Sequence, residues 1–200
     1  MLTIWGRADA INVQKVVWAA DEAGVPYRRI DAGRGHAPVT AALNPNRRVP
    51  TIDDDGFVLW ESNVIVRYVC ARYAAERLYP TDLLRRMDAE RWMDWAAIEL
   101  LRAYRPAFKA IHNAAPAAPD DTQMHFAKTT RLLEILDAHL ASRSYLLGEQ
   151  FSMADIPAGI IVHAWLNMGR AIPGIDAVKR WYRRLRERPA ATAAFSAPLS

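Results

Sequence analysis

Residues 44–63 read Asn-Pro-Asn-Arg-Arg-Val-Pro-Thr-Ile-Asp-Asp-Asp-Gly-Phe-Val-Leu-Trp-Glu-Ser-Asn, and this segment contains prolines, a turn signal and the start of a helix. Its two prolines exclude a regular helix at the start. The segments Thr51-Ile52-Asp53 and Phe57-Val58-Leu59 flank Asp54-Asp55-Gly56, a sequence typical of a tight turn between antiparallel strands. A helix is then expected over residues 62–73. The stretch therefore predicts a turn, a β-hairpin and a helix in that order.

The residues before this stretch supply two more strands and a helix. Residues 2–5 are a short apolar strand, and residues 13–23 carry apolar side chains at helical spacing. Residues 25–30 alternate as a strand does, and a loop over 31–38 follows them. A weak helical turn is expected over 39–43. The first part of the chain thus has the order β-α-β-(α)-β-β-α.

The second part of the chain has only helical periodicity. We expect an N-terminal α/β domain over residues 1–78 and a C-terminal all-helical domain over residues 84–200, joined by a linker around Tyr79-Pro80. In the second domain Ser152 and Asp155 have the spacing of a capping box at the start of a helix. The helices are predicted over residues 84–113, 122–142, 152–169 and 175–187, with a short last one near Pro189.

The composition is that of a packed globular protein. Of the 200 residues, 52% are hydrophobic and 24% are charged, which excludes disordered, collagen-like and coiled-coil proteins. The longest apolar stretches fall short of the roughly 20 residues that a membrane-spanning helix needs. The first residues do not have the pattern of a secretory signal. We therefore expect a cytoplasmic protein without a membrane partner.

Charge and cysteine content exclude further kinds of site. The net charge is only +4, and much of the excess lies in residues 179–188, where a solvated helix end is a better interpretation than a nucleic-acid contact. Cys70 is the only cysteine, and its apolar neighbours predict a buried structural thiol. No spacing of metal ligands and no glycine-rich phosphate loop occurs, so we expect neither a metal nor a nucleotide.

Four short motifs stand out along the chain: Asn12-Val13-x-Lys15-Val16, Asn44-Pro45-x-x-x-Val49-Pro50, Glu61-Ser62-Asn63 and Ser152-Met153-Ala154-Asp155. Together they resemble the motifs of the cytosolic glutathione transferases, especially those of bacterial members that place a serine, threonine or asparagine near the sulfur. The resemblance implies a thioredoxin-like first domain (βαβαββα), a helical second domain, glutathione as co-substrate and a homodimer. It also implies a small hydrophobic electrophile as the second substrate.

The resemblance places glutathione on the first domain. A cis bond between Val49 and Pro50 is expected to leave backbone groups facing outward, where they can pair with the peptide. Ser62, at the expected N-cap of a helix, suits the γ-glutamyl carboxylate, while Glu61 can accept hydrogen bonds from the ammonium of the same residue. Either Arg48 or His36 is expected to bind the glycyl carboxylate, with Arg48 favoured because guanidinium stays charged.

Thiol activation is expected at the start of the first helix, where Asn12 can donate to the sulfur. Its other possible role is to cap the helix with its own carbonyl oxygen. Ala10 stands where related sequences commonly have a hydroxyl or thiol, so either Asn12 acts alone, or Arg7 assists, or catalysis is feeble. Arg47 replaces a frequent glycine, and we expect strain if its φ is positive.

The second-substrate pocket is expected on the first helical segment of the second domain, at Tyr104, Arg105 and Phe108. The predicted function is thiol conjugation to an electrophile, or glutathione-dependent reduction of a peroxide or disulfide. Isomerisation or dehalogenation would use the same glutathione site. The alternative from another class is a non-catalytic binding or protein-interaction module that keeps the fold, which Ala10 favours.

Overall fold

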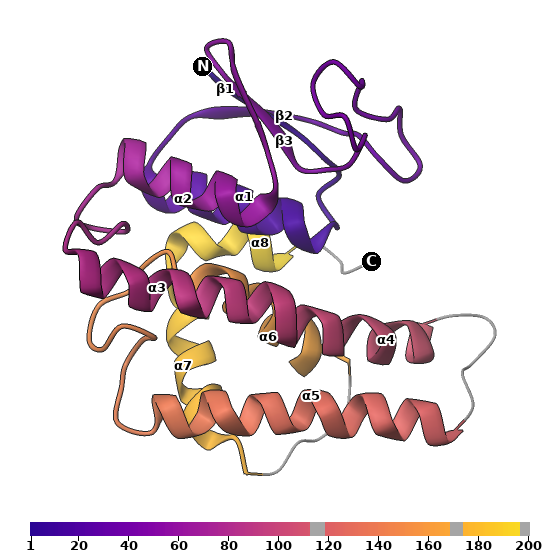
Figure 1. The fold of residues 1–200 in the computed structure, drawn as a ribbon, viewed down its shortest axis with the longest axis vertical. Helices are drawn as coiled ribbons and strands as arrows, with labels where there is room; N and C mark the ends of the chain where they lie inside the picture. Colours follow the sequence, from indigo (N-terminus) through magenta and orange to yellow (C-terminus); the bar gives the residue numbers. More distant parts are fainter. Residues whose placement is uncertain (113–118, 169–173, 197–200) are drawn as a thin grey trace. The chain divides into compact units, whose positions relative to one another are not determined.

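The structure, a computed structural model, describes residues 1–112, 119–168 and 174–196 (Figure 1). It divides into two compact units, one made of Met1–Arg86 with the residues after Leu185, the other of Met87–Leu185. The sequence predicts domains over 1–78 and 84–200, whereas here residues 186–196 group with the first unit. Residues 113 and 169, at which two of the predicted helices end, lie outside the described residues.

The first unit contains a four-stranded sheet of order β2-β1-β3-β4. Strand β1 (Leu2–Trp5) pairs in parallel with β2 (Tyr27–Ile30) and antiparallel with β3 (Thr51–Asp54), and β3 pairs antiparallel with β4 (Phe57–Trp60). The predicted hairpin is confirmed. Its two turn residues, Asp55 and Gly56, have φ values of 52° and 93°, as the two-residue turn that matches strand twist requires.

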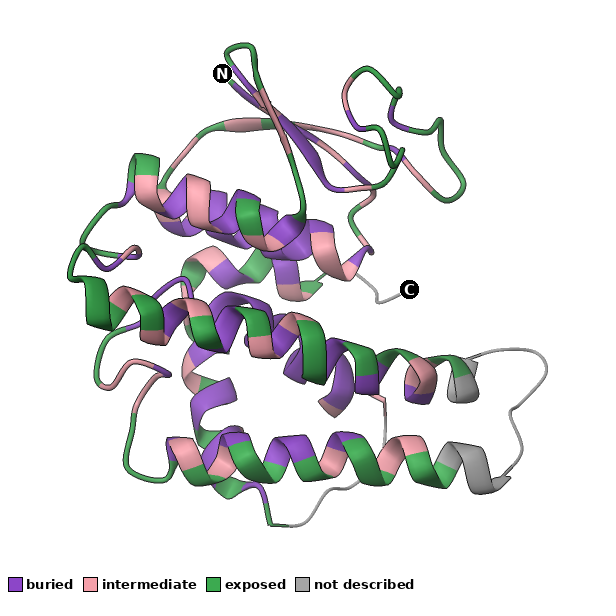
Figure 2. Cartoon of the chain, viewed as in Figure 1, coloured by how far each residue is buried: buried purple, intermediate pink, exposed green. Residues whose placement is uncertain are grey.

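Two helices cover one face of this sheet (Figure 1). Helix α1 (Ile11–Ala23) ends at Gly24 in the left-handed conformation, and α2 (Ser62–Tyr73) packs beside it. Their apolar sides are buried, as the purple segments of Figure 2 show. Cys70 on α2 is fully buried, which confirms the predicted structural thiol, and burial raises its pKa to about 12.

Two local predictions in the first unit need correction. Residues 39–43 form turns and no helix; the amide of Asn44 still donates to the carbonyl of Thr40 at 3.0 Å, but Pro45 prevents the turn from continuing. Strand β2 begins at Tyr27 and not at residue 25, because Pro26 has no N–H to give to the sheet.

The remaining helices are α3 (Leu83–Trp95), α4 (Leu101–His112), α5 (Pro119–Leu140), α6 (Asp155–Leu166) and α7 (Asp176–Arg186). The π-helical segment η1 (Ala96–Leu100) connects α3 to α4, so the helix predicted over 84–113 is three consecutive pieces. None of the described helices is long and apolar enough to cross a membrane.

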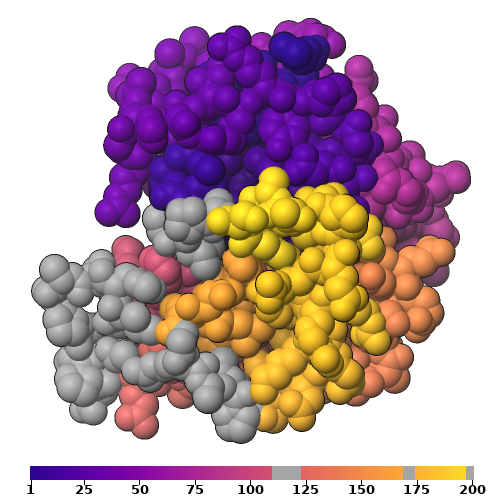
Figure 3. Space-filling model, turned by 180° about the vertical axis from the view of Figure 1, so that it is seen from behind, coloured from indigo at the N-terminus to yellow at the C-terminus, as the bar shows by residue number. Residues whose placement is uncertain are grey.

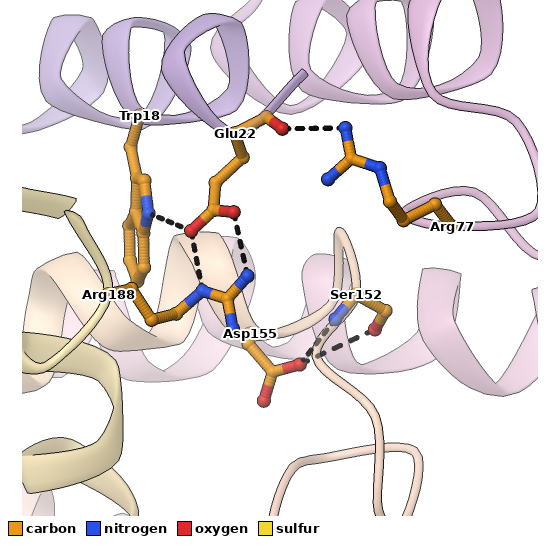
Figure 4. A network of polar contacts seen from close by, with 6 residues as sticks. All are labelled: Trp18, Glu22, Arg77, Ser152, Asp155 and Arg188. Carbon is orange, nitrogen blue, oxygen red and sulfur yellow. Dashed lines mark hydrogen bonds and ion pairs between the residues drawn. The ribbon is translucent and has the colours of Figure 1, made fainter. Parts of the chain in front are cut away.

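Helix α6 is the buried centre of the second unit, since its residues 155–165 are all buried. The sequence predicts that this helix begins at residue 152 with Ser152 as its N-cap, whereas α6 begins at Asp155 with Ala154 as the N-cap and without a side-chain cap. The predicted contact between the two residues is present: the amide of Ser152 donates to Asp155 Oδ2 at 3.0 Å (Figure 4). Asp155 also accepts bonds from the amide of Leu146 and from Trp181 Nε1, both at 2.9 Å. Although these donors favour the carboxylate, complete burial raises the pKa of Asp155 to about 6.

The last described residues belong to the first unit. After α7 the short helices η2 (Pro189–Ala191) and α8 (Thr192–Ser196) pack on α1; they are the yellow end of the chain in Figure 3. Arg188 donates two hydrogen bonds to the carboxylate of Glu22, at 2.6 and 2.7 Å (Figure 4). The ring of Phe195 lies edge-on to Trp18, with centroids 5.0 Å apart.

Candidate active site

The loop between β1 and α1 places Asn12 in the first turn of a helix that no side chain caps. The N-cap is Ala10, whose carbonyl accepts from the amides of Val13 at 2.8 Å and Gln14 at 3.0 Å. Asn12 is the second helical residue and is half-buried. Its Oδ1 is buried and has no hydrogen-bond partner among the described residues. The side chain is therefore not used for capping.

The loop before β3 is held by Asn44. Its Nδ2 donates to the carbonyl of Arg48 at 3.0 Å and to Thr51 Oγ1 at 3.1 Å, while its Oδ1 accepts from the amide of Asn46 at 2.9 Å. A buried amide with three bonds fixes the path of the chain. It leaves the side chains of Arg48 and Arg47 exposed.

The backbone of this loop has two special features. The Val49–Pro50 peptide bond is cis, as expected from the resemblance. Arg47 has a φ of 51°, which confirms the condition for strain at the position where glycine is frequent. A non-glycine residue in this left-handed region costs about 1–2 kcal/mol.

Glycines allow three segments to meet beside Val49. A Cβ on Gly33 would stand 3.3 Å from Val49 Cγ2 and 3.6 Å from Arg7 Nη1, and a Cβ on Gly6 would stand 3.3 Å from Val49 Cβ and only 2.3 Å from Val13 Cγ2. Both glycines have φ values disfavoured for other residues, +91° and +155°. The end of β1, the start of α1 and the loop around residue 33 thus converge on Val49.

The start of α2 differs from the prediction in register. The carbonyl of Glu61 accepts the amide of Ile65 at 2.9 Å, so Glu61 is the N-cap and Ser62 the first helical residue. The prediction that Ser62 is the N-cap is wrong, because the chain turns into the helix one residue earlier. Glu61 is exposed with φ 71° and ψ 111°, while Ser62 is buried. Such a conformation costs about 1–3 kcal/mol and is concentrated at functional sites.

A charged cleft of about 580 Å³ opens beside the β1–α1 loop. Arg7 forms an ion pair with Asp9 at 2.9 Å, and Arg29 pairs with Asp31 and donates to the carbonyl of Gly6 at 2.8 Å. The hydrogen bond from Arg29 lowers the pKa of Asp31, and the charges of Arg29 and His36 lower it further. Burial has the opposite effect but is outweighed. The cleft is lined by Arg7, Ala8, Asp9, Arg29, Asp31, Arg34, Gly35 and His36.

This cleft brings together two predicted residues, Arg7 and His36, and its lining does not include Arg48. Arg34 and Arg29 also line the cleft, although neither was predicted as a site residue. One feature of the sequence could have indicated Arg34 as a site residue: it stands between two glycines in a loop that follows a strand.

In the second unit, the predicted pocket residues face different surroundings. Tyr104 is buried, with its ring 5.5 Å from that of Phe108 and 6.5 Å from that of Trp165, whereas Arg105 is exposed. The hydroxyl of Tyr104 has no hydrogen-bond partner in the part of the chain that the structure describes. Burial raises the pKa of Tyr104, so this group is a neutral donor.

Comparison with known proteins identifies the family. Residues 11–72 match the profile of the glutathione S-transferase N-terminal domain, and residues 94–189 match that of the glutathione S-transferase C-terminal domain. Glutathione S-transferase GstB of Escherichia coli is 36% identical over the whole of both chains. The chain belongs to the glutathione S-transferase family. The predicted fold class, a thioredoxin-like domain with an all-helical domain, is thereby confirmed.

A solved structure and a further relative are also similar to this chain. The crystal structure of the theta class glutathione S-transferase from Xanthomonas axonopodis pv. citri with glutathione bound superposes with a TM-score of 0.93, at 38% identity, over 100% of this chain and 99% of that one. The disulfide-bond oxidoreductase YfcG of Escherichia coli is 28% identical over 90% of this chain and 87% of its own.

The described residues hold no cluster of three or more histidine, cysteine or carboxylate side chains with the geometry of a metal site.

Proposed function

We propose that this protein is a glutathione transferase that binds glutathione on its first unit and ionises the thiol at the start of α1. Family membership supports the activity, and the 38% identical theta class enzyme has glutathione bound. The observation that carries the proposed mechanism is the uncapped first turn of α1, where the Asn12 side chain is not used for capping.

The peptide would lie along the loop before β3. Backbone groups of Val49, next to Pro50, pair with the cysteinyl residue. The amides and dipole at the start of α2 attract the γ-glutamyl carboxylate, with the Ser62 hydroxyl as a further donor. Glu61, exposed and held at positive φ, accepts hydrogen bonds from the ammonium. At the other end, Arg48 or His36 neutralises the glycyl carboxylate.

Activation requires that the protein bind the thiolate better than the thiol. A thiol of pKa ~8.5 is mostly protonated at neutral pH, and lowering that pKa by about 2 requires roughly 2.7 kcal/mol of preferential stabilisation. The methyl group of Ala10 cannot donate. The Asn12 amide and the positive end of α1 supply the stabilisation. Arg7 adds positive potential from beside Gly33: its Nη1 would lie 3.6 Å from a Cβ on that glycine, which itself lies next to Val49.

The reaction would be a transfer of the glutathione sulfur. The thiol proton passes to solvent, the thiolate forms a bond to the electrophilic carbon, and the leaving group departs with its electron pair. With a disulfide acceptor, the thiolate attacks one sulfur and the other leaves as a thiol. The pocket for a small hydrophobic electrophile would include Phe108 and the donor hydroxyl of Tyr104, with Arg105 at its exposed edge.

A second copy of the chain is the proposed protein partner. Three large apolar side chains on β4 and α2 are exposed: Phe57 at 50%, Trp60 at 37% and Val64 at 43%. Exposed apolar side chains of this size are frequent at interfaces between subunits, and a two-fold homodimer is the most frequent assembly. We place the protein in the cytoplasm, where glutathione is kept as the thiol.

A titration of the bound thiol tests the proposal. Ultraviolet absorbance of the thiolate at saturating glutathione should give a pKa about 2 below that of free glutathione, and Asn12→Ala should return most of the difference. In the same variant kcat/KM for a chloronitroaromatic should fall about 10- to 100-fold near neutral pH. Gln123→Ala, which removes an exposed amide from α5, is the matched control.

Two results would contradict the proposed mechanism. A titration curve of the wild type that superimposes on that of free glutathione would exclude activation by the protein. Tight binding of glutathione without turnover of any electrophile or disulfide would favour the alternative, a binding module with the transferase fold, which the alanine at position 10 favours.

A further inference from the structure

Gly6 lies directly after β1, beside both segments that are proposed to meet the thiol. A Cβ on this glycine would stand 2.3 Å from Val13 Cγ2 and 3.3 Å from Val49 Cβ. Val13 follows Asn12 in the first turn of α1, and Val49 is the residue proposed to pair with the cysteinyl part of glutathione. Because Gly6 lies against both valines, the path of the chain at Gly6 helps to set the position of α1 relative to the bound peptide.

Both backbone groups of Gly6 are held by the end of β2. The amide of Gly6 donates to the carbonyl of Ile30 at 2.8 Å, and the carbonyl of Gly6 accepts from Arg29 Nη1, also at 2.8 Å. Arg29 in turn forms an ion pair with Asp31, and the Arg29 side chain is only 29% exposed. The guanidinium is therefore fixed between a carboxylate and the carbonyl at which the β1–α1 loop begins.

The loop leads from the peptide that Arg29 holds to the first turn of α1 in four residues, Arg7 to Ala10. Within it, the amide of Ala10 donates to the carbonyl of Arg7 at 3.3 Å, which is a long bond. Ala10, the N-cap, has no side-chain oxygen with which to bond the first amides of the helix. A shift of the peptide between Gly6 and Arg7 would therefore move the start of α1, because no capping side chain opposes it.

From these contacts we infer that Arg29 is a positioning residue for thiol activation. It holds the carbonyl of Gly6, and through Gly6 it holds the start of α1 where Asn12 can stabilise the thiolate. The inference rests on the proposed function and adds to it a residue that is not among the proposed glutathione contacts. Arg29 and Asp31 neutralise one another, so the effect comes from geometry and not from the charge of Arg29. Small displacements of a group near the reacting atoms can cost much of the rate.

Titration of the bound thiol in Arg29→Met tests the inference, because this variant keeps an unbranched side chain and removes both bonds of the guanidinium. The pKa of the bound thiol should rise by about 0.5–1 relative to the wild type. The kcat/KM for a chloronitroaromatic should then fall about threefold to eightfold at about pH 6, and less than about twofold at about pH 8.5, where both proteins ionise the thiol. Arg29→Lys should restore most of both values, since it can still donate to the Gly6 carbonyl.

Arg28→Met is the matched control. Arg28 precedes Arg29 in β2, is exposed, and lies on the opposite face of the sheet, so the thiol pKa should stay at the wild-type value. The affinity for S-methylglutathione, which has no ionisable thiol, should change by less than about twofold in Arg29→Met. A larger loss would overturn the inference, because Arg29 would then bind glutathione itself. So would a rise in pKa that disappears at about 0.5 M salt, since it would come from charge.

Hydrogen exchange separates failure of the inference from failure of the proposed function. The amides of Val13 and Gln14 donate to the carbonyl of Ala10, and they should exchange about tenfold faster in Arg29→Met than in the wild type or in Arg28→Met. If the wild type does not lower the pKa of bound glutathione, the proposed activation is contradicted, and faster exchange would still support the positioning by Arg29. Unchanged exchange in Arg29→Met would overturn the inference whether or not the thiol is activated.

Discussion

The ion pair between Glu22 and Arg188 should determine how firmly the end of the chain is attached to α1. Arg188 donates through Nε and one terminal nitrogen at 2.6 and 2.7 Å, and Trp18 Nε1 donates to the same carboxylate at 3.0 Å. The Glu22 side chain is only 5% exposed, whereas that of Arg188 is 26% exposed. Arg77 adds a bond to the Glu22 carbonyl at 2.7 Å. We predict that Arg188→Ala is strongly destabilising.

The size of the loss follows from this geometry. Removing one partner of a fully buried ion pair costs about 3–5 kcal/mol, because the other charge stays buried and unpaired. Here Trp18 would still donate to Glu22, and water can reach the space left by the partly exposed arginine. Both effects lower the loss to about 2–3 kcal/mol. For a chain of this length the melting temperature should fall by about 5–10 °C.

Urea denaturation followed by tryptophan fluorescence measures this loss directly. Glu22→Gln and the double variant complete a thermodynamic cycle, in which the coupling between the two residues should exceed about 1 kcal/mol. Arg131→Ala is the control: its ion pair with Glu134 has side chains 76% and 50% exposed, and its loss should stay below about 0.5 kcal/mol. A loss in Arg188→Ala no larger than in this control would refute the reasoning.

Three further predictions concern single positions. Arg47→Gly should raise the free energy of unfolding by about 0.5–1 kcal/mol in urea denaturation, because it removes the strain at a φ of 51°. Gly33→Ala should lower stability by about 1–2 kcal/mol and raise the KM for glutathione, since the new methyl group would press on Val49; an unchanged KM would contradict the proposed binding site. The pKa of Asp155 is raised from 3.8 to about 6, so the native state binds more protons than the unfolded state between these values, and the contribution of this group to stability falls as pH rises through the window. The stability of the wild type relative to Asp155→Asn should therefore fall by roughly 2 kcal/mol from about pH 4 to about pH 6.5, and a pH-independent difference would exclude this assignment.

Much of the fold could be predicted because its signals are local. The turn residues 54–56 fix the hairpin, and the helix predicted over 62–73 is α2 with the same ends. Errors occurred where two local signals compete within a few residues. Residues 39–43 have helical spacing, but Pro45 stops the helix before a full turn can be stabilised.

The candidate site could be predicted by residue type but not by local geometry. Glu61 and Ser62 were expected to cooperate at the start of α2, yet which of them is the N-cap depends on the direction from which the chain leaves β4. Whether Asn12 caps α1 was equally open, because asparagine serves as cap or as donor with the same sequence signal. The structure excludes capping, and the proposed contact with the thiol stays a prediction.

Most of the secondary structure, the family and the residue types at the thiol end of α1 could be predicted from the sequence, since these depend on periodicity, turn residues and short motifs. The contact of Arg188 with Glu22 across 166 residues and the place of residues 186–196 in the first unit became visible only in the folded chain. Folding alone also joined Arg7, Arg34 and His36 in one cleft. The physical reason is that the electrostatic interaction between two charged side chains is weak in water. It becomes strong only when packing removes the water and fixes the distance between the two charges.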